Sequence, residues 1–218
     1  MTLAAIEVEA QAHALTIRGA IHPVADPHVP ADCQTLVMLG PDEPAFWQVF
    51  AASAEHGDGQ PDPLDRWSRR VVGSLAEQFG GQAILPSDGP PYPPFLRWAR
   101  ATGRCWTSPT GLLVHDTAGL MLSFRGALAL PLRLGLSPRV ESPCLTCADR
   151  PCTSVCPIGA LGTEGAYDVP ACQTYLATDA GQDCRLGGCL VRRACPVSSA
   201  HRRDPAQAAF HMAAFVKD

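Results

Sequence analysis

Cysteine is the residue that most constrains how this chain can fold, because eight of its ten cysteines fall between positions 144 and 195. They form two runs, and each run ends in a Cys-Pro pair. The first run reads CLTCADRPCTSVCP over residues 144–157; the second comprises Cys172 and the stretch CRLGGCLVRRACP over residues 184–196. Disulfides, structural zinc and iron–sulfur clusters are the three structures that this density of thiols favours.

The spacing and the N-terminus separate these alternatives. A disulfide framework needs an oxidising compartment, but the first residues have no basic region before their apolar stretch and carry Glu7 and Glu9, so they do not read as a signal peptide. Zinc ribbons use two Cys-x2-Cys pairs, and only Cys144 and Cys147 have that spacing here. We therefore favour iron–sulfur ligation, with zinc as the remaining alternative.

The two runs resemble the layout of a bacterial-type two-cluster ferredoxin, in which each [4Fe–4S] cluster takes its fourth thiolate from the other run. The resemblance implies one cluster on Cys144, Cys147, Cys152 and Cys195 and a second on Cys156, Cys172, Cys184 and Cys189. More residues separate Cys147 from Cys152, and Cys184 from the cysteines that follow it, than in the compact ferredoxin run. This departure bears on which type of cluster is bound more than on whether a cluster is bound. Cys33 and Cys105 lie outside both runs, and we interpret them as small buried hydrophobes.

Composition narrows the function classes further. The 218 residues suffice for one domain of about 140 residues and a smaller one. A net charge of −4 argues against a nucleic-acid surface, and the arginine pairs are too scattered to change this. No apolar stretch reaches the ~20 residues that a membrane span needs. We expect a soluble, cytoplasmic protein with neither a membrane nor a nucleic acid as partner.

The hydrophobic pattern predicts an α+β fold. A helix over residues 3–15, a strand from Leu15, a buried central strand over residues 35–40 and a helix over residues 44–54 come first. Asp62 and Pro63 open a helix through Phe79, in which apolar residues recur every three or four positions. A short strand at residues 83–86 and a helix over residues 94–101 follow. Residues 111–115 and 120–130 are expected to pair as a β-hairpin.

Short motifs in this front part resemble CblC-type vitamin B12-processing proteins. They are GLLVHDTAGLMLSFRG at residues 111–126, TLVMLG at 35–40, DPLD at 62–65 and YPPFL at 92–96. Residues 167–168 and the ACQTYL of residues 171–176 resemble the ferredoxin module of epoxyqueuosine reductase, which joins a CblC-like corrinoid domain to two [4Fe–4S] clusters. The resemblance implies a nitroreductase-like domain over residues 1–138 that binds cobalamin base-off, and a bacterial ferredoxin-like domain over residues 139–218.

The same resemblance implies roles for four residues of the front part. Gly111 matches a position where the backbone passes close to the corrinoid, and a bare Cα permits that approach. Arg125 matches an arginine that grips the glutathione carboxylate, with an exposed strand-end cation as the alternative. Asp88 matches a proton-donating aspartate, although its proline-rich loop favours a capping role. His115 is either a corrin contact or, by default, a satisfied structural histidine.

Together these expectations describe an oxidoreductase that passes electrons from an external donor, a flavoprotein or a ferredoxin, through two clusters to the cobalt of cobalamin. Removal of the upper ligand or reduction of the corrinoid would result, and glutathione is a further partner that the resemblance suggests. Two alternatives stay open. One is a cobalamin-dependent reductase of an organic substrate, and the other is a non-enzymatic corrinoid carrier or ferredoxin.

Overall fold

The computed structural model describes residues 1–162 and 167–216, which divide into two compact units. Unit 1 comprises residues 1–104 and 123–140, and unit 2 comprises residues 105–122 and 141–218. Residues 105–122, which the sequence analysis assigned to the front domain, therefore cluster with the cysteine-rich segment. None of the described helices combines the length and apolar character that a membrane crossing requires.

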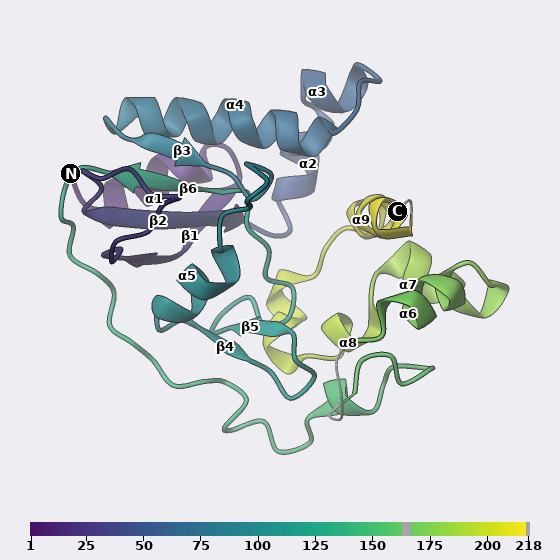
Figure 1. Ribbon diagram of the computed structural model, residues 1–218. Helices are drawn as coiled ribbons and strands as arrows, with labels where there is room; N and C mark the ends of the chain where they lie inside the picture. The colour runs from purple at the N-terminus through teal and green to yellow at the C-terminus, as the bar shows by residue number, and fades with distance from the viewer. Residues whose placement is uncertain (163–166, 217–218) are drawn as a thin grey trace. The chain divides into compact units, whose positions relative to one another are not determined.

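Unit 1 is built on a four-stranded antiparallel sheet in the order β1-β2-β6-β3 (Figure 1). Its strands are β1 (Leu15–Ile21), β2 (Thr35–Pro41), β3 (Gln82–Ile84) and β6 (Gly126–Leu130). Every residue of β2 and β6 is buried, which explains their near-continuous apolar sequences. The predicted buried central strand at residues 35–40 is confirmed.

The helices of unit 1 are α1 (Leu3–Gln11), α2 (Phe46–Ala51), α3 (Ala54–Gly57), α4 (Pro63–Gln78) and α5 (Phe95–Ala101). Helices α1 and α5 contact β1, and α3 packs on α4. Helix α4 begins at Pro63, as predicted, and packs on β3 and β6 through an apolar face that includes Trp67, Val71 and Leu75 (Figure 1). The mixed α+β class is confirmed for the described residues; a nitroreductase-like topology stays a prediction.

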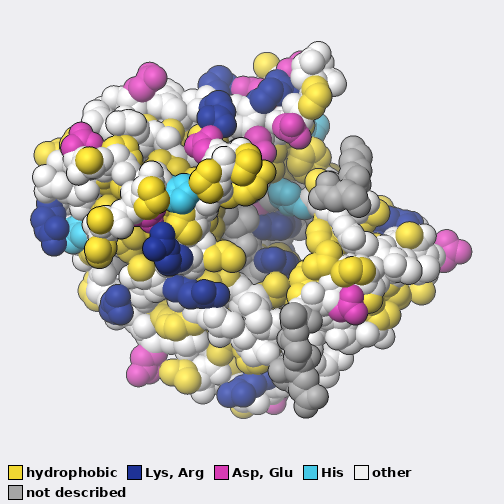
Figure 2. All heavy atoms as spheres, in the orientation of Figure 1, with side chains coloured by type: hydrophobic (Ala, Val, Ile, Leu, Met, Phe, Trp, Pro, Cys, Tyr) yellow, Lys and Arg dark blue, Asp and Glu magenta, His cyan; other side chains and the backbone are white. Residues whose placement is uncertain are grey.

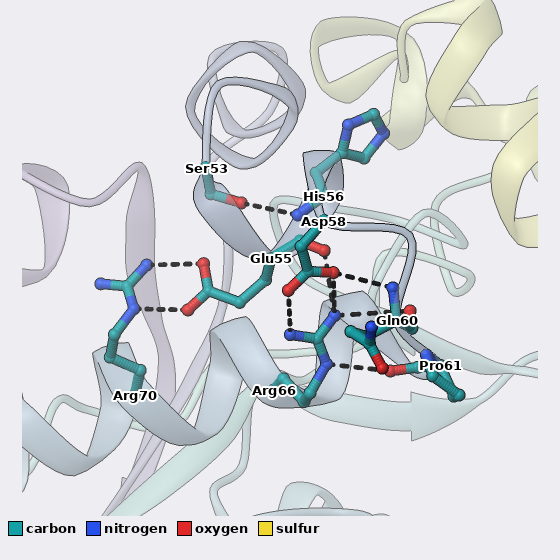
Figure 3. A network of polar contacts seen from close by, with 8 residues as sticks. All are labelled: Ser53, Glu55, His56, Asp58, Gln60, Pro61, Arg66 and Arg70. Carbon is teal, nitrogen blue, oxygen red and sulfur yellow. Dashed lines mark hydrogen bonds and ion pairs between the residues drawn. The ribbon is translucent and has the colours of Figure 1, made fainter.

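A polar network fixes the segment that precedes α4 (Figure 3). Arg66 donates to both carboxylate oxygens of Asp58 at 2.7 and 2.8 Å and to the carbonyl oxygens of Glu55, Gln60 and Pro61. Arg70, one helical turn further on, holds the Glu55 carboxylate. Over α3 and α4 the basic and acidic side chains are interspersed rather than gathered into one basic patch (Figure 2).

Unit 2 consists of a small sheet followed by short helices. Strands β4 (Cys105–Thr107) and β5 (Leu113–His115) pair antiparallel. The helices are α6 (Val169–Leu176), α7 (Gln182–Gly187), α8 (Leu190–Arg193), α9 (Pro205–Val216) and the 3₁₀ turns η1 (Pro151–Thr153), η2 (Asp179–Gly181) and η3 (Pro196–His201). A bacterial ferredoxin-like topology for this unit stays a prediction.

The predicted hairpin between residues 111–115 and 120–130 is wrong. Strand β5 pairs with β4, whereas β6 enters the sheet of unit 1 between β2 and β3. All five side chains of Gly126–Leu130 are buried, a pattern that suits a strand covered on both faces rather than the arm of a surface hairpin. The chain turns back over residues 116–119, where an isolated bridge pairs His115 with Gly119.

Candidate metal centre

A cavity of about 410 Å³ in unit 2 is lined by four cysteines, three from the first run and one from the end of the second. These four, the first cysteine group, are Cys144, Cys147, Cys152 and Cys195. Cys152 and Cys195 are also part of an apolar cluster with Val114, Leu120 and Val191. The structure thus brings together the four thiols that crossed ligation assigns to one cluster.

Turns and short helices position this group. Cys152 lies in η1, which follows Arg150 in the left-handed region at φ +41°. Cys195 directly precedes η3 and lies against the turn that ends β5. Gly119 in that turn has φ +57°, and a Cβ there would lie 2.4 Å from the Ser198 Oγ and 3.0 Å from the Cys195 Sγ. Only glycine permits this approach without displacing the cysteine segment.

Ser198 also holds the segment after Cys195 against the turn that contains Gly119. Its buried hydroxyl accepts from the backbone N–H groups of Leu120 and Met121, at 2.9 and 3.3 Å, and donates to the carbonyl oxygen of Ala118 at 3.2 Å. One side chain therefore saturates three backbone groups of the 115–122 turn. Sequence patterns did not reveal this role, because nothing in a lone serine two residues after Cys-Pro distinguishes it from a loop residue.

Two thiols of the first group lie in surroundings that disfavour their charged form. Burial raises the pKa of Cys144 and of Cys152, and neighbouring thiolates in the group raise both further. For Cys144, hydrogen bonding with Ser142 opposes part of this effect. Four negative charges cannot accumulate here without a compensating cation, so binding of metal would release protons.

The second cysteine group comprises Cys156, Cys172, Cys184 and Cys189. Cys172 lies in α6, Cys184 in α7, and Cys189 directly precedes α8. Burial raises the pKa of Cys172, with the charges of Cys189 and Cys156 adding to the effect. Burial also raises the pKa of Cys184, and Cys189 again adds to it. Crossed ligation assigns these four cysteines to the other cluster, and that assignment stays a prediction.

Two polar side chains accompany the second group. Burial raises the pKa of the Tyr167 phenol, and the neighbouring Cys172 adds to the effect. The guanidinium of Arg192 donates to the Leu120 carbonyl oxygen at 2.5 Å and interacts electrostatically with Cys189 and Tyr167. The sequence analysis used Tyr167 only as part of a resemblance and gave no role to Arg192.

Among the described residues, no three His, Cys, Asp or Glu side chains form a group that would hold a single metal ion. Thiolates that share one zinc ion all lie about 2.3 Å from it. In a [4Fe–4S] cubane each of the four thiolates binds a different iron, so the sulfurs are spread more widely around the cofactor. The four cysteines that line the unit 2 cavity are the kind of donor set that a cubane takes, and a cluster on them stays a prediction.

The two cysteines outside these groups differ from each other. Cys105 is buried in β4, as predicted. Cys33 is only half-buried, and its thiol donates to the Thr35 carbonyl oxygen at 3.4 Å.

The residues expected to contact cobalamin are divided between the two units. Gly111 and His115 belong to unit 2, whereas Asp88 and Arg125 belong to unit 1. Gly111 is exposed in the β4–β5 turn with φ +78°, and nothing lies within 4 Å of a Cβ placed there. The turn alone therefore accounts for this glycine.

His115 and Asp88 both have structural partners. The fully buried His115 ring has its Nδ1 3.1 and 3.2 Å from the backbone nitrogens of Thr117 and Ala118, which is the satisfied structural role. Asp88 accepts from the Leu85 N–H at 2.8 Å and pairs with Arg69 at 2.7 Å. Its carboxylate thus caps the loop, and a proton-donating role stays a prediction.

Arg125 directly precedes β6 and differs from the exposed strand-end cation that was the alternative. Burial lowers the pKa of its guanidinium, while Asp65 and Glu43 act in the opposite direction. Its buried Nε has no hydrogen-bond partner among the described residues. A guanidinium with a free donor fits an anionic ligand group, so the carboxylate-gripping role stays a prediction.

No protein-family model, curated protein or solved structure matches this chain. The likeness to CblC-type proteins and to epoxyqueuosine reductase therefore stays a prediction.

Proposed function

We propose that this chain is an iron–sulfur oxidoreductase that holds two [4Fe–4S] clusters and transfers electrons through them. The observation that carries the proposal is the first cysteine group. Cys195, from the second run, lines the same cavity as three cysteines of the first run. A bound cluster supplies one-electron chemistry, and each ligand set takes a member from the other run, which ties the two cluster sites into one folded module.

The protein's own residues would hold the clusters and control their surroundings. Apolar side chains, among them Val114, Leu120 and Val191, pack around Cys152 and Cys195 and limit the access of water to their sulfurs. The charge of Arg192, whose guanidinium donates to the Leu120 carbonyl oxygen, acts on Cys189 of the second group. Burial, charge and hydrogen bonds to sulfur are the properties by which proteins tune such clusters.

Anaerobic purification followed by metal analysis tests this proposal. We expect a brown protein with about eight irons per chain, since each cubane holds four. Cys195→Ser and Cys156→Ser should each reduce the iron content towards about four and leave different clusters, distinguishable by EPR after reduction. Cys33→Ser, outside both groups, is the matched control and should keep all the iron. Zinc in place of iron, or equal loss in the control, would refute the proposal.

We propose cobalamin as the electron acceptor to test first, on the resemblance of the front part. Added cyanocobalamin or methylcobalamin separates the candidates. Turnover with an external reductant supports reductive processing of the corrinoid, whereas binding without turnover supports a carrier. Turnover of epoxyqueuosine would instead support a reductase that uses cobalamin as its cofactor. No absorbance change with any corrinoid would restrict the proposal to electron transfer.

A further inference from the structure

Ser108 lies on the face of the small sheet that is directed at the first cysteine group. It directly follows β4, in which Trp106 pairs with Val114 of β5. Side chains two residues apart on a strand share a face, so Ser108 continues the face of Trp106. Val114 belongs to the apolar cluster that contains Cys152 and Cys195, and Trp106 packs against that cluster. Ser108 and Val114 both line the cavity of the four cysteines.

The backbone of Ser108 is held at both of its polar groups. Its N–H donates to the Leu112 carbonyl oxygen at 2.8 Å, and its own carbonyl oxygen accepts from the Gly111 N–H at 3.0 Å. The residue is only 6% exposed. The tight turn therefore fixes Ser108 in the wall of the cavity, where its side chain cannot move out to water.

The hydroxyl of Ser108 is one of a buried pair. Its Oγ lies 3.1 Å from the Oγ1 of Thr110, which is also buried. Two hydroxyls have two protons, and the contact between them uses one. The described residues offer no acceptor for the other proton. A buried donor without an acceptor is costly, so this proton needs a partner that the protein chain does not supply.

The position of the pair indicates where that proton lies. If Thr110 donates to Ser108, the remaining proton is on Ser108, which lines the cavity. The reverse arrangement would leave the proton on Thr110, which is not among the residues that line it. Sulfur atoms in the cavity would accept the proton only in the first arrangement, so a bound cluster favours it.

Few other groups in the cavity wall can donate to sulfur. Four lining residues are prolines, which have no N–H: Pro109, Pro143, Pro151 and Pro196. The other polar lining side chains, apart from the cysteines, are exposed to water, and they belong to Thr146, Asp149 and Arg150. Among the described lining residues, Ser108 therefore supplies the one buried hydroxyl.

We propose that the Ser108 hydroxyl donates a hydrogen bond to a sulfur of the cluster on the first cysteine group and raises the reduction potential of that cluster only. This inference rests on the proposed function. Reduction adds one electron to the cluster, and part of the added charge resides on its sulfurs. A hydrogen bond to sulfur is therefore stronger in the reduced state and favours it. The electron comes from the external donor, and no bond forms or breaks in this step.

Single-cluster backgrounds give the clearest test. The full-length Cys156→Ser protein should keep only the cluster on the first cysteine group, and Cys195→Ser only the other one. Potentiometric titration with dithionite, followed by EPR, gives one potential for each. In the first background, Ser108→Ala should make reduction about tenfold less favourable, which is about 59 mV for one electron. In the second background, the same substitution should have no effect.

Thr146→Val is the matched control. Thr146 lines the same cavity, but its hydroxyl donates to the Pro143 carbonyl oxygen at 3.4 Å, so the potential should stay unchanged. No shift in Ser108→Ala, or equal shifts in the control or in both backgrounds, would overturn the inference while leaving the clusters established.

A second variant covers the case in which Ser108→Ala fails to load iron. Thr110→Val should then make reduction of the same cluster about threefold less favourable, because a hydroxyl that accepts a hydrogen bond is itself a stronger donor. An unchanged potential in Thr110→Val would also overturn the inference. Absence of iron from the unsubstituted protein would instead refute the proposed function itself.

Discussion

Replacement of Gly119 by alanine should remove one cluster and spare the other. The new methyl group would lie 2.4 Å from the Ser198 Oγ, 2.7 Å from the Ser198 backbone nitrogen and 3.0 Å from the Cys195 sulfur. Alanine at φ +57° costs about 1–2 kcal/mol, and displacement of a packed backbone costs about 1–3 kcal/mol more. The sum, about 2–5 kcal/mol, acts on the segment that carries Cys195.

Iron analysis and EPR of the anaerobically purified variant check this prediction. We expect the iron content of Gly119→Ala to fall from about eight towards about four, with the remaining signal matching that of Cys195→Ser. Gly111→Ala is the control, because Gly111 has φ +78° and open space around its Cα. The Gly111→Ala variant places alanine at a positive φ without a steric clash, and it should keep its iron.

Ser198→Ala tests the same contact by removing atoms instead of adding them. It leaves the backbone N–H groups of Leu120 and Met121 without their hydroxyl partner, at a cost of about 1–3 kcal/mol. The same cluster should become the more labile one. The reasoning fails if Gly119→Ala keeps both clusters, or if Ser198→Ala preferentially loses the cluster expected on Cys156, Cys172, Cys184 and Cys189.

Three further outcomes are expected. The pKa of Glu55 is lowered to about 2, chiefly by the hydrogen bond from Arg70, so the stability contributed by the Glu55 carboxylate is complete above pH ~4.5 and is lost as the pH falls towards 2. Glu55→Gln should therefore destabilise unit 1 by about 0.5–1 kcal/mol at neutral pH but not near pH 2, whereas the control Glu77→Gln should show no such pH-dependent loss. Urea melts at neutral and acid pH measure the difference. Chelation of iron should increase amide exchange in residues 105–122 and 141–216 while residues 1–104 stay protected, and equal exchange throughout would contradict this. Decyanation of cyanocobalamin should be lost in Cys189→Ser and kept in Arg125→Ala, and the reverse result would favour thiol-dependent chemistry.

The regular parts of the fold could be predicted from the sequence because their signals are local. Asp62-Pro63 and the spacing of Trp67, Val71 and Leu75 specify α4, and an uninterrupted apolar run specifies β2. The grouping of the cysteines came from a spacing pattern that depends on ligand geometry. That spacing can be read from the sequence without knowledge of the surrounding fold.

The errors arose where the partner is distant in sequence. Leu120–Leu130 has the composition of a hairpin strand, but its first residues are held by Ser198 and its last five join β2 and β3. A β-strand pattern states that a segment is half- or fully buried and does not state which strand it pairs with. The capping role of Asp88 was foreseeable from its Pro-rich loop, whereas its pairing with Arg69 was not.

The two units keep their folds by different means. Unit 1 buries a sheet and its helices, whereas the apolar cluster of unit 2 includes two of the cysteines proposed as ligands, Cys152 and Cys195, among its buried residues. Burial raises the pKa of Cys152, and a neutral thiol packs as a small hydrophobe. In the proposed cluster-bound protein, metal would replace that proton and contribute its binding free energy to folding. The proposed ligands and the apolar cluster of unit 2 would then share residues, so a substitution that loosens the packing around Cys195 would also weaken cluster binding.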